Sequence, residues 1–270
     1  MDTPPILSVV IVTYNSASVV GHALESIFNC LITFEYEIIV VDNNSTDNTI
    51  EIISNFESDK LILIKNKKNY GFAKANNIGF ELCKGEYILI LNPDIVLTEK
   101  TNLPYLIHYI KNKSSVGIIA PKLLYENDKT QESARNFPNP ILLLIRGLNL
   151  EKYFARFNFY KNFLLIDKKD IAPIYVDWVI GAFILIRKDI LIQINYFDDK
   201  YFMYYEDADL SLRLLKNGYK TFYVPYCEAI HKYQRESAKK TFSKLKYYHI
   251  KSILRFFRKH LIFLIRYKKI

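Results

Sequence analysis

Three acidic side chains stand close together in Glu206-Asp207-Ala208-Asp209, directly after the aromatic segment Tyr201–Tyr205. The helix dipole favours acidic residues in a first helical turn, so simple capping is one interpretation. Three acids in four positions exceed what a cap requires, and aromatic neighbours can raise a carboxyl pKa into the range useful to a general base. The stretch therefore predicts a catalytic base, with capping as the open alternative.

A second candidate is Asn92-Pro93-Asp94, which follows the apolar segment Tyr87–Leu91. Mg²⁺ and Mn²⁺ prefer oxygen ligands, usually one or two carboxylates together with phosphate oxygens of a substrate. Asp94 is therefore a candidate metal ligand, although a turn is the simpler interpretation of Asn-Pro-Asp by itself. A single histidine is usually a surface or hydrogen-bonded residue, but His231 is a candidate third partner for Asp94 and Asp207.

The glycine-rich nucleotide motifs are absent from the sequence. The first strand-like segment ends in Thr13-Tyr14-Asn15 instead of G-x-G-x-x-G, which argues against a dinucleotide-dependent oxidoreductase. A P-loop motif and a G-x-S-x-G elbow are also missing. Asp42 and asparagine side chains could still hold a nucleotide, with a metal ion on its diphosphate.

The segments that must position these residues alternate between strand and helix over the first 120 residues. The expected strands are Ile6–Thr13, Tyr36–Val41, Leu61–Lys65, Tyr87–Leu91 and Val116–Ala120, and the expected helices are Ser18–Leu31, a segment ending at Phe56, Ala73–Cys83 and Glu99–Lys111. This alternation predicts a doubly wound parallel α/β sheet with right-handed crossovers. Ligands bind beyond the carboxyl ends of such strands, where Thr13, Asp42 and Asp94 stand, so we expect a polar ligand site on one rim.

The pattern changes after Pro121. Residues Gln131–Ile171 are irregular, which fits a lid, an acceptor-binding loop or simple packing on the sheet edge. The remaining expectations are strand character over Ile174–Arg187, a helix over Glu206–Asn217 ended by Gly218, a short strand over Lys220–Val224 and a polar loop that holds His231.

The net charge of +9 is unevenly distributed. Residues 237–270 contain eleven Lys and Arg side chains and no acidic one, whereas residues 1–236 contain 26 basic and 28 acidic side chains. We therefore expect a near-neutral body over 1–236 and a basic helical tail over 237–270. A near-neutral body without a nucleic-acid-binding motif argues against nucleic acid as a partner.

The tail has helical periodicity. At 100° per residue, the arc of about 60° on either side of Ile250 contains Ile253, Leu254, Phe257, Leu261 and Leu264. Such a basic amphipathic helix can lie on an anionic membrane surface, or its apolar face can pack on the domain while its charges are solvated. Both interpretations stay open.

Cysteine spacing and apolar run lengths bear on the compartment. Cys30, Cys83 and Cys227 form no C-x-x-C pair, which argues against a zinc or iron–sulfur site and fits a reducing compartment. The first residues lack the regions of a signal peptide, and the apolar runs are much shorter than the ~20 residues that span a bilayer. We expect a cytoplasmic protein, which the tail could hold peripherally on the inner face of the cytoplasmic membrane.

Six segments in this order resemble a known family. They are Ser8–Asn15, Val40–Thr49, Asn69–Gly79, Leu89–Asp94, Asp177–Ala182 and Phe197–Leu210, with His231 after the last. The ordered set resembles the family-2 glycosyltransferases, in particular their bacterial rhamnosyltransferase-like branch, over about residues 6–260. The resemblance implies the GT-A fold: a Rossmann-like, mostly parallel sheet flanked by helices, here with a basic C-terminal helical extension.

The resemblance also implies a role for each matching residue. The donor side would use Thr13, Tyr14 and Asn15 around the nucleobase, Asp42 on the pyrimidine ring or its sugar, and Asn69, Gly71 and Asn76 along the nucleotide cleft. Asn92-Pro93-Asp94 stands where the family has Asp-x-Asp, so Asp94 and His231 would contact a divalent metal ion, Mg²⁺ or Mn²⁺, or the diphosphate. Trp178 and Gly181 would shape the sugar and acceptor subsites.

The implied reaction is an inverting sugar transfer. Asp207, oriented by neighbours such as Glu206, would remove the proton of the acceptor hydroxyl while its oxygen attacks the anomeric carbon from the opposite face. The metal ion and nearby dipoles would stabilise charge on the leaving nucleoside diphosphate. The expected donor is dTDP-L-rhamnose, and the expected acceptor is a saccharide or lipid-linked saccharide of a cell-surface polysaccharide.

Two alternatives remain at this point. The same fold could use a UDP-hexose donor for galactosyl or glucosyl transfer. A catalytically silent nucleotide-sugar-binding protein is the alternative from another class, and the presence of Glu206, Asp207, Asp94 and His231 argues against it. The sequence leaves the linkage and the oligomeric state open.

Overall fold

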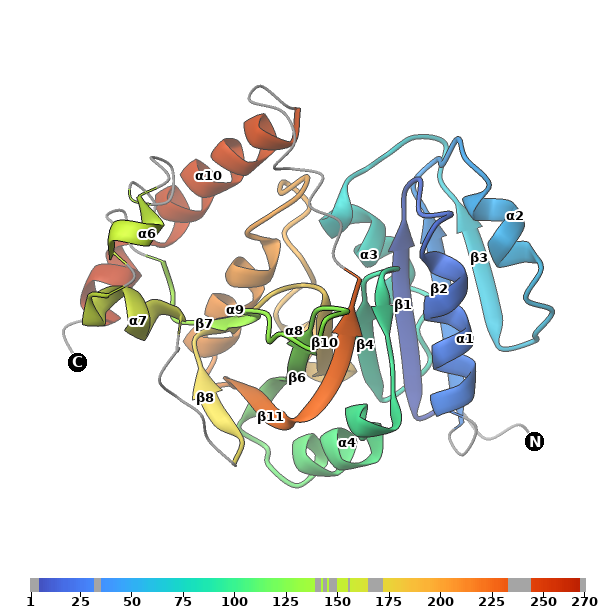
Figure 1. Cartoon of the computed structure of the whole chain (residues 1–270), viewed down its shortest axis with the longest axis horizontal. Helices are drawn as coiled ribbons and strands as arrows, with labels where there is room; N and C mark the ends of the chain where they lie inside the picture. Colours follow the sequence, from blue (N-terminus) through green and yellow to red (C-terminus); the bar gives the residue numbers. More distant parts are fainter. Residues whose placement is uncertain are drawn as a thin grey trace.

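A computed structural model describes residues 5–31, 35–138, 142, 145, 150–154, 156–164, 172–232 and 244–267. Within these residues, one nine-stranded sheet has the order β3-β2-β1-β4-β10-β6-β11-β5, with β8 paired to β11 (Figure 1). Its strands are β1 (Leu7–Thr13), β2 (Tyr36–Asp42), β3 (Leu61–Lys65), β4 (Tyr87–Leu91), β5 (Ile95–Val96), β6 (Val116–Leu124), β8 (Ile174–Val176), β10 (Phe183–Arg187) and β11 (Lys220–His231). A separate antiparallel pair is formed by β7 (Ala134–Arg135) and β9 (Trp178–Val179).

Helices cover both faces of this sheet. They are α1 (Val20–Cys30), α2 (Thr49–Ser54), α3 (Phe72–Phe80), α4 (Leu103–Lys111), α6 (Glu151–Phe154), α7 (Asn158–Leu164), α8 (Lys188–Gln193), α9 (Glu206–Lys216) and α10 (Lys244–Tyr267), with a 3₁₀ turn at η1 (Glu99–Thr101). Figure 1 shows α1 and α3 on opposite faces of β1 and β2. Double-sided cover explains why these strands are apolar runs rather than alternating sequences.

The register aligns the carboxyl ends of the first strands. β1 is parallel to β2 and β4, and Thr13 at the end of β1 lies opposite Asp42 at the end of β2. Asp42 in turn lies opposite Lys65 at the end of β3. The loops after β1 and β2 consequently lie at one edge of the sheet, the upper edge in Figure 1. The five strands predicted over the first 120 residues are confirmed, and together they position the predicted rim.

Of two strand predictions from the second half, one is confirmed and one is wrong in part. The segment Ile174–Arg187 is three strands, of which β10 runs antiparallel to both β4 and β6. The short strand predicted over Lys220–Val224 continues to His231, which pairs with Ile95 of β5 and lies in no loop. A register shift between Val224 and Glu228 lets the strand continue past Pro225, which has no N–H to donate to a neighbouring strand. The sequence predicted the end of the strand at this proline because proline is rare inside strands.

The helix predicted over Glu99–Lys111 is interrupted. Asn102 adopts a left-handed conformation with φ of 46° between η1 and α4, and its side chain accepts a hydrogen bond from the N–H of Tyr105 over 3.3 Å. Asparagine tolerates this conformation, so Asn102 ends one element and caps the next. The predicted end of the Glu206 helix is confirmed, because Gly218 follows α9 with φ of 85°.

The C-terminal helix α10 packs against the body along one face. Ser252, Phe256, His260 and Leu264 are buried there, and Figure 1 shows α10 crossing the end of the molecule that contains α9. The predicted stripe centred on Ile250 coincides with this face only in part, because Leu264 is buried whereas Ile250, Leu254 and Leu261 are exposed. Four tail lysines, Lys239, Lys240, Lys268 and Lys269, lie outside the described residues. No described helix is both long and apolar enough to cross a membrane.

Candidate active site

The rim begins with a hydrogen-bonded set around Asp42. Thr13 donates its hydroxyl to Asp42 Oδ1 over 2.8 Å, and Ser45 donates its backbone N–H to Oδ2 over 2.8 Å and its hydroxyl to Oδ1 over 2.5 Å. Asp42 has no exposed surface in this conformation. Its carboxylate therefore holds the ends of β1 and β2 and the following loop in one shape.

The side chains above this set face solvent. The ring of Tyr14 is half exposed, and Asn15, with φ of 52°, donates its N–H to Ser45 Oγ over 2.8 Å. The Asn15 side-chain oxygen accepts the N–H of Thr46 over 2.8 Å, which joins the loops after β1 and β2. An exposed aromatic ring on a fixed backbone is a surface on which a flat heterocyclic base can stack.

The loop before α3 is fixed by Gly71. A Cβ on Gly71, whose φ is 84°, would lie 2.2 Å from the carbonyl oxygen of Phe202, so only glycine fits. The Gly71 N–H donates to Asn69 Oδ1 over 2.8 Å, and the Gly71 carbonyl accepts from Asn43 Nδ2 over 3.2 Å. Asn43 also donates its backbone N–H to the carbonyl of Thr13 over 2.8 Å, which connects this loop to the rim around Asp42.

Asn76 lies one helical turn further along α3. It is buried and donates its side-chain N–H to the Phe72 carbonyl over 3.0 Å. Its side-chain oxygen is buried and accepts no hydrogen bond from another described residue. A buried polar atom in this state is costly unless water or a ligand supplies the donor, which fits a cleft-lining residue.

Asp94, after the end of β4, lies beside the buried His231. His231 Nε2 lies 3.2 Å from Asp94 Oδ1, and the other ring nitrogen, Nδ1, lies 2.8 Å from Gln131 Oε1. The turn interpretation of Asn92-Pro93-Asp94 holds as well, since the N–H of Ile95 donates to the Asn92 carbonyl over 3.2 Å. A turn is therefore the device that places Asp94 beside His231.

The chemistry of this pair suits a divalent cation. Among the described residues no group of three or more His, Cys, Asp or Glu side chains could hold a metal ion. One carboxylate and one imidazole are nevertheless the donor set expected where phosphate oxygens of a substrate complete the coordination. Because Gln131 Oε1 can accept from Nδ1, it would keep the Nε2 lone pair directed toward Asp94 and any ion there.

Asp207 occupies the first turn of α9 and is oriented by backbone donors. Gly181 donates its N–H to Asp207 Oδ2 over 2.8 Å, and Ala208 donates its N–H to Oδ1 over 2.7 Å. Burial raises the pKa of Asp207 to about 6, while these two donors and the positive charge of Arg135 act in the opposite direction. A carboxylate with this pKa is ionised at neutral pH and basic enough to accept a proton.

The neighbouring Glu206 differs from Asp207 in its protonation state. Burial and the adjacent charge of Asp207 raise the pKa of Glu206 well above its usual range, and its Oε2 atom makes no hydrogen bond with another described residue. Two adjacent buried carboxyls do not both ionise easily, so at neutral pH this pair carries its negative charge on Asp207. The hydrogen bonds that orient Asp207 come from the backbone N–H groups of Gly181 and Ala208, whereas the resemblance implied that neighbours such as Glu206 orient it.

Aromatic and basic side chains border Asp207. Trp178 lies nearly parallel to Tyr205, with ring centroids 6.5 Å apart, and donates its indole N–H to the Asn136 carbonyl over 3.1 Å. The guanidinium of Arg135 lies 5.5 Å from the centroid of Trp178. Aromatic rings and a cation beside a carboxylate form a surface that can bind a sugar and negatively charged groups attached to it.

The separate parts meet at the turn between β9 and β10. A Cβ on Gly181 would lie 3.4 Å from the Phe72 ring and 3.6 Å from Asp207 Cβ, so α3, this turn and α9 touch there. The N–H of Asn92 donates to the Ala182 carbonyl over 2.9 Å, which brings in the end of β4. The structure thus brings every residue predicted for the site onto connected elements of one rim.

Sequence reasoning gave no individual role to four residues that the structure places in the rim, although it included two of them, Asn43 and Ser45, in the predicted polar edge. Gln131, Arg135, Ser45 and Asn43 each contact or influence a predicted site residue. Ser45 and Asn43 lie within the polar segment after β2, so their position carried a signal. Gln131 and Arg135 lie in the irregular region, where no periodicity or motif marked them.

A mixed sheet with helices on both faces carries at its rim the buried carboxyl of Asp207, the Asp94–His231 pair and the polar residues around Asp42, an arrangement that fits a glycosyltransferase of the GT-A fold. The sequence profile described as "Glycosyl transferase family 2" matches residues 8–193. The chain belongs to this family, and the expected family and fold are confirmed.

Two relatives extend over most of the chain. The chain is 31% identical over 258 residues to "Rhamnosyltransferase WbbL" of Escherichia coli strain K12, an alignment that covers 81% of this chain and 91% of that protein. It is 26% identical over 239 residues to "N-acetylglucosaminyl-diphospho-decaprenol L-rhamnosyltransferase" of Mycobacterium tuberculosis, covering 84% of this chain and 76% of that protein.

Solved structures share the fold. GalNAc-T7, solved with UDP, GalNAc and Mn²⁺, superposes with a TM-score of 0.65 at 16% identity and covers 89% of this chain. The mannosyltransferase PcManGT of Pyrobaculum calidifontis, solved with GDP-Man and Mn²⁺, superposes with a TM-score of 0.60 at 17% identity and covers 87% of this chain. The chain spans 45% and 59% of the length of these two structures, and at such identities the likeness concerns the fold alone.

Proposed function

We propose that this glycosyltransferase transfers L-rhamnose, with inversion, from dTDP-L-rhamnose to a saccharide or lipid-linked saccharide. The observation that carries the proposal is the buried Asp207, held by the N–H groups of Gly181 and Ala208 on a rim shared with the Asp94–His231 pair. The printed names of both curated relatives support rhamnose as the sugar, and the mycobacterial name supports a diphospholipid-linked acceptor.

Asp94 and His231 would hold a divalent cation, Mn²⁺ or Mg²⁺, against the donor's diphosphate. Such an ion, when bound, supplies positive charge where negative charge develops on the leaving group. Gln131 keeps the His231 ring in place, and the turn over Asn92–Ile95 keeps Asp94 in place. Asp94 and His231 take no part in proton transfer in this proposal.

The chain's own part in the reaction centres on Asp207. Its carboxylate accepts the proton of the acceptor hydroxyl as the new C–O bond forms at the anomeric carbon and the bond to the diphosphate oxygen breaks. The attacking oxygen approaches from the face opposite the leaving group, so the configuration inverts in one displacement. Glu206, which keeps its own proton, limits the negative charge that the acceptor must approach.

Nucleotide-induced stabilisation tests the donor assignment. We expect dTDP with Mn²⁺, at a hundredfold excess over its Kd, to raise the unfolding temperature by roughly 5–10 °C over that of the nucleotide-free protein. UDP or GDP with Mn²⁺ at the same concentration should raise it less. Asp94→Asn should lose most of the increment that Mn²⁺ adds. Asp128→Asn, the same change at an exposed turn residue, should keep it.

The outcomes separate the alternatives. Preference for UDP would replace rhamnose by a UDP-hexose as donor sugar. No response to any nucleotide, with or without Mn²⁺, would favour a catalytically silent protein. Transfer from dTDP-L-rhamnose with retained anomeric configuration, seen by NMR of the product, would contradict the single displacement.

The pH profile of the reaction follows from the state of Asp207. Because the base must be ionised, kcat/KM should rise with pH through about 6 and level off above it. Arg135→Gln should move this midpoint upward, since removal of a nearby positive charge disfavours the carboxylate. Arg187→Gln, at the exposed Arg187–Asp189 pair on another part of the chain, should leave the midpoint in place. A rate that falls as pH rises from 5 to 7 would contradict the assignment of Asp207 as the base.

A further inference from the structure

One face of helix α10, its inner face, packs against the body of the protein. Two of its basic residues are neutralised by buried or half-buried acids of the body: Arg255 Nη2 lies 2.6 Å from Asp198 Oδ2, and Lys259 Nζ lies 2.7 Å from Asp209 Oδ1 and 2.9 Å from Asp198 Oδ2. His260 Nε2 lies 2.7 Å from the same Asp209 oxygen as Lys259. These contacts, with the buried ring of Phe256, fix which side of α10 faces away from the body.

The opposite side presents an apolar row to solvent. This outer row consists of Tyr247, Ile250, Leu254, Leu261 and Ile265, whose exposed fractions lie between 40% and 66%. At 100° per residue the five side chains fall within an arc of about 60°, and they extend over about 27 Å of helix. Aliphatic exposure on this scale is unusual for a surface that contacts only water.

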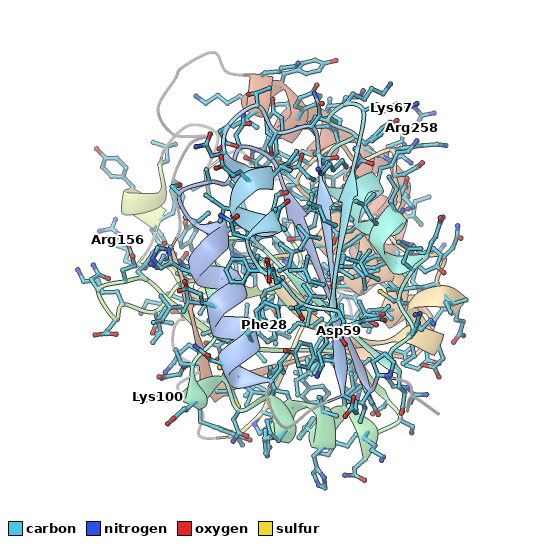
Figure 2. The ribbon with its side chains drawn as sticks, turned by 90° about the vertical axis from the view of Figure 1, so that its right-hand side faces the viewer. Phe28, Asp59, Lys67, Lys100, Arg156 and Arg258 are labelled. Carbon is cyan, nitrogen blue, oxygen red and sulfur yellow. The ribbon has the colours of Figure 1, made fainter. Side chains whose placement is uncertain are left out.

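Basic side chains flank the outer row. Lys251 and Arg258 are exposed on the adjacent arc and form no ion pair with another described residue, and Arg258 lies at the outer edge of the molecule in Figure 2. No acidic residue occurs between Lys244 and Tyr267. The outer side of α10 is therefore both apolar and uniformly positive.

We infer that the outer row of α10 is a docking surface for a lipid bilayer with acidic headgroups. A helix of this type lies in the plane of the interface, with its apolar side chains among the acyl chains and its cations at the phosphates. A second copy of the chain fits less well, because a symmetric contact would bring Lys251 and Arg258 of both copies together with no acidic group on α10 to pair with them.

The outer row starts beside the catalytic rim. Tyr248 stacks on Phe202 with ring centroids 4.1 Å apart, and His249 lies 5.8 Å from the ring of Tyr205, the residue before Glu206. A bilayer under α10 would therefore lie next to the acceptor side of Asp207. With the bilayer in this position, a lipid-linked acceptor could reach Asp207 without leaving the membrane. This role of Asp207 and of the acceptor rests on the proposed function.

Vesicle sedimentation of the full chain, without donor or acceptor, tests the inference. The chain should bind vesicles of phosphatidylcholine and phosphatidylglycerol at least tenfold more strongly than vesicles of phosphatidylcholine alone, and added salt should weaken the binding. The triple variant Leu254→Gln, Leu261→Gln, Ile265→Gln should lose binding about tenfold or more. The pair Lys251→Gln and Arg258→Gln should lose the preference for phosphatidylglycerol.

Matched controls keep the result interpretable. Leu82→Gln and Ile192→Gln remove aliphatic side chains that are 44% and 49% exposed elsewhere on the chain, and they should bind as the unmodified chain does. Unchanged thermal unfolding of the outer-row variant would show that it is folded. Equal binding to both vesicle types, undiminished binding of the outer-row variant, or a dimer in light scattering that this variant abolishes would overturn the inference. None of these outcomes depends on the nucleotide response, so failure here and failure of the proposed function are distinguishable.

Discussion

Asp207→Asn should reduce kcat for sugar transfer about 10³-fold at pH 7.5. The change keeps the size of the side chain but removes the group that accepts the hydroxyl proton, and general bases contribute roughly 10²- to 10⁴-fold to such rates. Because Gly181 and Ala208 both donate to the carboxylate, the amide can satisfy only one of them and holds its position less well. Product formation from labelled donor under single-turnover conditions measures the effect.

Two controls show whether the loss is chemical. The variant should keep its nucleotide-induced stabilisation, because Asp94, His231 and the rim around Asp42 are untouched. Asp199→Asn, the same change at an exposed residue eight positions earlier, should transfer sugar at the unmodified rate. Activity of Asp207→Asn within tenfold of the unmodified enzyme would show that another group is the base.

Gly71→Ala should be among the most destabilising single-methyl changes in the chain. The new Cβ would lie 2.2 Å from the Phe202 carbonyl oxygen and 2.8 Å from the Phe202 ring, at a φ of 84° that disfavours any side chain. The Phe202 carbonyl also accepts the N–H of Phe72 over 2.7 Å, so it cannot move without loss of that bond. We expect a loss of about 3 kcal/mol or more in the free energy of unfolding.

Gly218→Ala separates the effect of the positive φ from the effect of the steric contact with Phe202. Gly218 has nearly the same φ, 85°, but nothing lies within 4 Å of the position that its Cβ would take. This variant should lose only the conformational contribution, about 1 kcal/mol. Urea unfolding of both variants gives the difference, which measures the contact with Phe202. Equal losses would show that the loop before α3 adjusts freely and that Gly71 is not fixed by the contact.

Much of the rim could be predicted from the sequence because its signals are local. Apolar runs that end in polar residues located the carboxyl ends of β1, β2 and β4, and parallel pairing then placed Thr13, Asp42 and Asp94 at one edge. Three acids in four positions likewise marked the segment Glu206–Asp209, within which the family resemblance singled out Asp207.

The contacts that tune the site could not be predicted. Gln131 lies 100 residues from His231, and the N–H of Gly181 lies 26 residues from the carboxylate that it binds. Such pairings depend on how whole strands are arranged, which no local pattern records. The packing face of α10 could not be predicted for a similar reason: Ile250 is more apolar than His260, but His260 is the buried residue because it contacts the buried Asp209.

The ion pairs of α10 also determine where the chain should not be cut. Asp209 lies two residues after Asp207 in the same helix, and Lys259 and His260 supply two of its partners. A deletion at the charge boundary near residue 236 would remove both and leave a buried carboxylate with Arg213 alone among the partners described. A loss of catalysis in such a shortened protein would therefore report a disturbed α9 and would not show that the tail takes part in the reaction. In this respect the positively charged end of the sequence is part of the scaffold that holds α9, the helix of Asp207.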